Sequence, residues 1–131
     1  MSYLRWTLPA ATLALSLLVS SPALAFELFQ SHDADVERGN QRMQEQDYAA
    51  AREAYEAAVR RLPSEGAVHL DRGLALMAGG DLDQARSSFL AATAPPASRE
   101  IRAAAYYDMG LAFYRQGEAA AQGAQATPPA A

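Results

Sequence analysis

Histidine and acidic side chains, from which hydrolytic and metal sites are commonly built, do not form a recognisable motif in this sequence. His32 and His69 are far apart, and neither has a nucleophile or a further ligand at a catalytic spacing. Asp33 and Asp35 lie where a helix is expected to begin, and negative charge is favourable at that end of a helix. These residues predict no catalytic site, no metal and no cofactor. A small periplasmic enzyme is the least favoured function.

Charge and cysteine content exclude further classes of protein. The chain has 11 basic and 15 acidic residues, a formal net charge of −4, and no run of basic residues. Such a chain is poorly suited to binding nucleic acid or anionic lipid. The absence of cysteine excludes disulfides, thiol catalysis and cysteine-bound metal. We therefore expect a protein or peptide partner and no nucleic acid.

Residues 1–25 show the features of a secretory signal peptide in the expected order. Arg5 precedes an apolar run over residues 8–19, and Ala23 and Ala25 form the pattern of small residues that signal peptidase reads. An uncleaved membrane anchor is the alternative, but a membrane-spanning helix needs about 20 apolar residues, more than this run supplies. We therefore expect cleavage after Ala25.

The processed chain would begin at Phe26. It would carry 10 basic and 15 acidic residues, a net charge of −5, because residues 1–25 contain one arginine and no acid. No cysteine follows the cleavage point to carry a lipid anchor. We expect a periplasmic or secreted protein that is not stably inserted in a membrane.

The sequence contains an internal repeat. GNQRMQEQDYAAA, which starts at Gly39, is echoed by GLALMAGGDLDQA from Gly73, an offset of 34 residues (73 − 39), and in part by GLAFYRQGEAAAQ from Gly110. Small and large residues recur together at this offset in the first two units, and a proline ends the first unit. Gly110 follows Gly73 by 37 residues (110 − 73), which indicates a short insertion before the third unit. The recurring positions and that proline are Gly39, Ala51, Tyr55, Ala58, Pro63, Gly73, Ala85, Phe89, Ala92 and Gly110.

Each unit is expected to form two helices joined by a turn. Gly39 lies midway along the first helix, where glycine costs about 1 kcal/mol relative to alanine. That cost is tolerable if another helix packs against the bare backbone, and we expect Ala51 of the second helix to do so. Tyr55, one turn further on, is expected to fill the gap between neighbouring helix pairs. The equivalent residues of the second unit are Gly73, Ala85 and Phe89.

The length of the unit and its glycine, alanine and aromatic positions resemble the tetratricopeptide repeat, which folds as a helix–turn–helix. The resemblance implies an all-α fold, a short α-solenoid of about two and a half repeats and five helices. The expected divisions are a signal peptide (1–25), an N-terminal lead (26–31), repeat 1 (32–65), repeat 2 (66–99), a partial repeat 3 (100–118) and a low-complexity alanine and proline tail (119–131).

The resemblance also implies a function. In this family the first helices of successive repeats line a concave groove, which here would bind an apolar helix or extended peptide. The chain would then be an exported bacterial scaffold or adaptor. The residues at the groove positions are Val36, Asn40, Met43, Leu70, Leu74, Met77, Tyr107, Leu111 and Tyr114.

The stretch SREIRAAAYYDMGLAFYRQGE supports an alternative function. It resembles exported repeat proteins of bacterial aerotolerance operons, which accompany membrane proteins with von Willebrand-type domains. The chain would then be a component of an aerotolerance-type complex in the cell envelope.

The third repeat lacks an obvious second helix. Tyr106 is expected in the core, whereas the stripe of Tyr107, Leu111 and Tyr114 is either packing or binding surface. Phe113 fills the large position that a following helix would bury, so we expect its face to be covered by a second copy or by a partner helix. In the alternative, residues 118–126 form a short alanine helix that folds back over this face.

Overall fold

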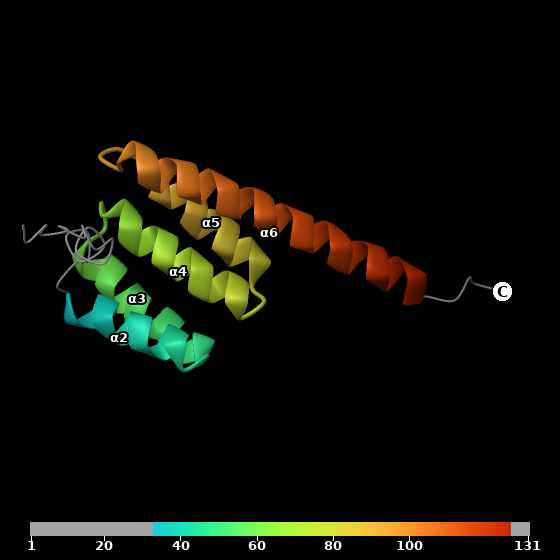
Figure 1. The fold of residues 1–131 in the computed structure, drawn as a ribbon, viewed down its shortest axis with the longest axis horizontal. Coiled ribbons are helices and arrows are strands. Elements are labelled where there is room, and N and C mark those ends of the chain that lie inside the picture. Colours follow the sequence, from blue (N-terminus) through green and yellow to red (C-terminus); the bar gives the residue numbers. More distant parts are fainter. Residues whose placement is uncertain (1–32, 127–131) are drawn as a thin grey trace, which may run out of the picture. The chain divides into compact units, whose positions relative to one another are not determined.

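The computed structural model describes residues 33–126, and the predicted cleavage site at Ala23 and Ala25 lies outside them. The described part is all-helical, as expected, with five helices (Figure 1). Among these residues no helix is both long and apolar enough to cross a membrane. The helices are α2 (Ala34–Gln44), α3 (Tyr48–Arg61), α4 (Gly66–Ala78), α5 (Leu82–Ala92) and α6 (Arg99–Ala126).

The turns inside the two helix pairs are built alike. Asp47 caps α3 by accepting a hydrogen bond from the Ala50 backbone N–H at 3.1 Å, and Asp81 caps α5 in the same way. Just before each cap the backbone is left-handed, with φ of 59° at Gln46 and 88° at Gly80. The two helix pairs are therefore alike in the backbone conformation of their turns as well as in sequence.

Consecutive helices pack against one another: α2 on α3, α3 on α4, α4 on α5, and α6 on both α5 and α4. The buried side chains form two clusters. One lies among α2, α3 and α4 around Tyr55, and the other among α4, α5 and α6 around Phe89. This arrangement confirms the short helical solenoid.

The glycines of the first helices meet aromatic rings, which differs from the expected contact with alanine. A Cβ on Gly39 would overlap the ring of Tyr55, and a Cβ on Gly73 would overlap the ring of Phe89. Ala51 is fully buried in the same cluster as Tyr55. The rings are the nearest groups because they are long enough to reach the first helix from the second, and a flat ring can lie directly on a backbone that has no Cβ.

Helix α6 does not end with the partial third repeat near residue 118. It is one continuous helix of 28 residues, which runs along α5 and α4 and continues beyond them (Figure 1). The side chain of Tyr114 donates a hydrogen bond to Glu118 Oε1 at 3.0 Å, one turn ahead. Residues 118–126 therefore do not fold back, and this part of the chain supplies no second helix for the third repeat.

Candidate protein-binding surface

The nine predicted groove residues do not form one surface. Val36 and Met77 are only 4% and 8% exposed and belong to the core, which differs from the prediction. Val36 packs in the cluster of Ala51 and Tyr55, and Met77 in the cluster of Phe89. Buried side chains of this kind cannot contact a partner without unfolding of their surroundings.

A second group of predicted groove residues is half-buried. Asn40 Oδ1 accepts a hydrogen bond from the Tyr55 hydroxyl at 2.7 Å, so this amide supports the packing of α3 on α2. Met43 packs at the edge of the same cluster. The three leucines pack against the cluster around Phe89 while part of each side chain faces solvent; these are Leu70, Leu74 and Leu111.

The exposed aromatic residues lie on α6. Tyr107 and Tyr114 are 74% and 63% exposed, and they flank Leu111 at spacings of four and three residues. Tyr106 and Phe113 are also more than half exposed, so the expectation that Tyr106 lies in the core is wrong. It is exposed because, within residues 33–126, no second helix follows α6 to cover it.

Asp71 on α4 is a residue that the sequence reasoning missed. Burial raises the pKa of its carboxyl to about 6. Burial and, to a smaller extent, the charge of Asp71 raise the pKa of the Tyr55 hydroxyl. The spacing of the sequence indicates the burial of Asp71. Val68, Asp71 and Ala75 share one helix face, and both apolar members of this face are buried.

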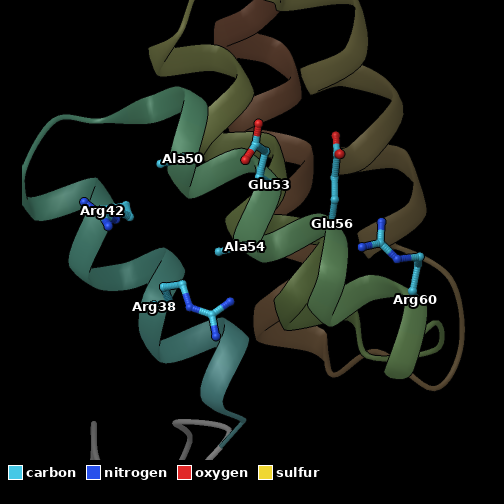
Figure 2. A pocket seen from close by; sticks show the side chains of 7 residues that line it. All are labelled: Arg38, Arg42, Ala50, Glu53, Ala54, Glu56 and Arg60. Atoms are coloured by element: carbon cyan, nitrogen blue, oxygen red, sulfur yellow. The ribbon is translucent and has the colours of Figure 1, made fainter.

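A hollow of about 510 Å³ lies between α2 and α3 (Figure 2). Its lining is charged: Arg38 and Arg42 come from α2, while Glu53, Glu56 and Arg60 come from α3. No group of His, Asp and Glu side chains that could hold a metal ion occurs within residues 33–126.

The equivalent position in the second repeat is closed by the first repeat. Arg72, which corresponds to Arg38, donates a hydrogen bond to the buried Ser88 hydroxyl at 3.2 Å. It also lies 3.5 Å from Glu56 of α3. The hollow therefore lies on the outer face of the first repeat. This face is polar, as the outer face of a terminal repeat normally is.

Two helix pairs with the same caps, the same left-handed turn and the same ring on a glycine identify a repeated unit. Residues 36–100 match the tetratricopeptide repeat family. The match supports a tetratricopeptide-repeat protein, and it covers most of α2, all of α3, α4 and α5, and the first residues of α6. No curated protein and no solved structure matches the chain. Tetratricopeptide repeats generally mediate protein–protein interaction and are typically not enzymes.

Proposed function

We propose that this chain is an exported adaptor of the bacterial cell envelope that binds an apolar helix or an extended peptide of a protein partner. The binding site is a surface on α4 and α6, here called the leucine–tyrosine surface. It consists of Leu70, Leu74, Tyr107, Leu111 and Tyr114.

The observation that carries this proposal is the contact between α4 and α6. The leucines of both helices pack on one core cluster, so they are held in place by the fold, and each still offers apolar area to solvent. The two exposed tyrosines add rings with a hydroxyl at the tip, a side chain that is common at protein interfaces. An apolar partner segment fits this chemistry.

Site-specific photo-crosslinking in the native cell tests the proposal. A photoreactive phenylalanine analogue replaces Tyr107, and a matched control carries it at Arg38, in the charged hollow on the other side of the repeat stack. We expect one envelope protein to be crosslinked from residue 107 and not from residue 38. Equal crosslinking from both residues, or none from residue 107, would contradict the proposed surface.

The same experiment distinguishes the alternative function. A crosslinked membrane protein with a von Willebrand-type domain would place the chain in an aerotolerance-type complex, as the sequence of α6 suggested. Export is tested separately by the intact mass of the protein recovered from the periplasm or the medium. We expect a chain that starts at Phe26, and a full-length chain in the membrane fraction would contradict export by a cleaved signal.

A further inference from the structure

Two aromatic residues lie between small residues along the solvent side of α6. Six positions spaced alternately by three and four residues form what we call the α6 seam: Ala103, Tyr106, Gly110, Phe113, Gly117 and Ala120. This is the heptad spacing by which one helix packs along another. All six residues are exposed, with Tyr106 at 57% and Phe113 at 54%. Apart from Phe113, which an arginine of α5 partly covers, the α6 seam is thus an apolar helix face that the described part of the chain leaves open.

The two complete repeats show what fills such a face. Gly39 and Gly73 are each covered by a ring from the next helix. Gly110 is the corresponding glycine of the third repeat, and nothing lies within 4 Å of the position that a Cβ would take there. The same holds at Gly117. Each of these glycines is therefore an open site for an aromatic ring carried by another helix.

A second copy of α6 supplies both rings when it runs antiparallel. In one register Phe113 lies opposite Gly110 of the second copy, Tyr106 lies opposite Gly117, and Ala103 lies opposite Ala120. Two-fold symmetry makes each contact occur twice. Every large residue then meets a small one, which lets the two helices approach closely. A parallel pair would instead set Phe113 against Phe113 and Gly110 against Gly110.

Phe113 is already held in place for this contact. The guanidinium of Arg86 on α5 lies over its ring, 4.4 Å from the centroid. Arg86 is in turn anchored by Asp83, whose Oδ1 is 2.7 Å from Nη2. One face of the ring is thus fixed by the chain's own second repeat, while about half of the side chain remains open to a partner.

The two ends of the repeat stack differ in a way that agrees with this pairing. The outer face of the first repeat is the charged hollow of Arg38, Arg42 and Glu53, which suits contact with water. The outer face of α6 carries aromatic rings and glycines instead. Terminal repeats normally need a polar outer face, so the apolar end is the one that requires cover.

We propose that the chain forms a two-fold dimer by antiparallel packing of the α6 seam against the seam of a second copy. The contact extends about 25 Å along the helix, from Ala103 to Ala120. Tyr107 and Tyr114 directly follow the seam residues Tyr106 and Phe113, so they lie at the edge of this contact, between the seam and the leucines of the leucine–tyrosine surface. The dimer does not depend on the proposed binding function.

Substitution of Gly110 tests the dimer. Gly110→Leu adds a side chain where the ring of Phe113 of the second copy would lie. In the single chain its Cβ meets no described atom within 4 Å, and leucine favours the helix. The control is Arg115→Leu, which adds the same side chain on another face of α6. The sample is the purified protein in the processed form that its cells make, studied by sedimentation equilibrium.

We expect the natural protein and Arg115→Leu to dimerise equally. Gly110→Leu should raise the dimer Kd by roughly a hundredfold or more, because the clash occurs twice, while its helical circular dichroism is kept or increased. A natural protein that stays monomeric at millimolar concentration would overturn the proposal. So would a Gly110→Leu variant that dimerises like the natural protein, or equal weakening by both substitutions.

Engineered cysteines test the register, since the natural chain has none. An Ala103→Cys chain mixed with an Ala120→Cys chain should form a disulfide-linked pair, because these Cα atoms would lie within the roughly 7 Å that a disulfide allows. Neither variant alone should crosslink, because identical residues would be about 25 Å apart along the antiparallel helices. Crosslinking of Ala103→Cys with itself, or no crosslink in the mixture, would overturn the antiparallel register.

Discussion

The ring of Phe89 on α5 lies where a Cβ on Gly73 of α4 would be, with its Cδ1 2.6 Å from that position. Tyr55 and Gly39 repeat this relationship in the first unit. The glycine is therefore needed for close approach of a ring, and its helix-propensity cost is offset by the burial of that ring.

Replacement of Gly73 by alanine should destabilise the domain. The added methyl group overlaps Phe89, and overpacking of this kind costs about 1–3 kcal/mol even though alanine is the better helix former. We expect the midpoint of thermal unfolding to fall by roughly 5–15 °C, measured by circular dichroism. The control is Gly123→Ala on α6, where an added Cβ would meet no described atom within 4 Å, so no loss is expected. An unchanged midpoint for Gly73→Ala would mean that the ring does not lie on this glycine.

Met77 and Leu74 should respond differently to a charge. Met77→Glu places a carboxylate in the core, where the native side chain is 8% exposed, and should cost about 4 kcal/mol or unfold the domain. Leu74→Glu changes a half-buried side chain and should cost about 1 kcal/mol. Urea unfolding of both variants measures the difference. Equal losses of stability would show that Met77 is no more buried than Leu74.

Asp71 should make stability fall as the pH rises. Its pKa in the folded chain, about 6, is above its ordinary value of 3.8, so the folded state holds the proton more tightly. The contribution of Asp71 to stability is therefore fully present below about pH 4 and is lost as the pH rises through about 6. Asp71→Asn should stabilise the domain by about 2–3 kcal/mol at pH 8 and by little at pH 4.

The exposed Glu37→Gln on α2 is the control for this pH dependence and should retain the behaviour of the natural chain. Unfolding by urea at both pH values provides the measurement. If Asp71→Asn is no more stable than the natural chain at pH 8, the carboxylate of Asp71 is not destabilised by burial.

The left-handed residue before α3 is a site for stabilisation. Gln46 has φ of 59°, a conformation that glycine adopts at lower cost, and its counterpart Gly80 has φ of 88°. Gln46→Gly should raise the free energy of unfolding by about 0.5–1 kcal/mol, and Gly80→Ala should lower it by about 1 kcal/mol. Changes of the same sign in the two variants would contradict the equivalence of the turns.

The repeat could be predicted from the sequence because its information is local. The offset from Gly39 to Gly73, the caps Asp47 and Asp81 and the aromatic at the large position together specify two helix pairs. The length of α6 could not be predicted in the same way, because the alanine, glycine and proline composition of residues 119–131 is typical of a low-complexity tail. A glycine costs only about 1 kcal/mol, and the run of alanines after Glu118 is enough for the helix to continue.

The binding surface was predicted only in part. A position in the repeat gives the direction in which a side chain points, but its burial depends on the neighbours from other helices. Val36 and Met77 are buried in clusters to which other helices contribute, which their own segment of sequence does not reveal. Leu74 and Tyr107 keep exposed area, so these residues carry the proposed function.

The most direct test of the adaptor function is the affinity of the chain for the partner crosslinked through residue 107. Leu74→Arg places a charge in the leucine–tyrosine surface, and Glu37→Arg places the same side chain on the exposed side of α2. Isothermal titration calorimetry should show Leu74→Arg binding at least about tenfold more weakly, a loss of roughly 1.4 kcal/mol, with its helical signal intact. Glu37→Arg should bind like the natural chain. Equal affinity of the two variants would contradict the account.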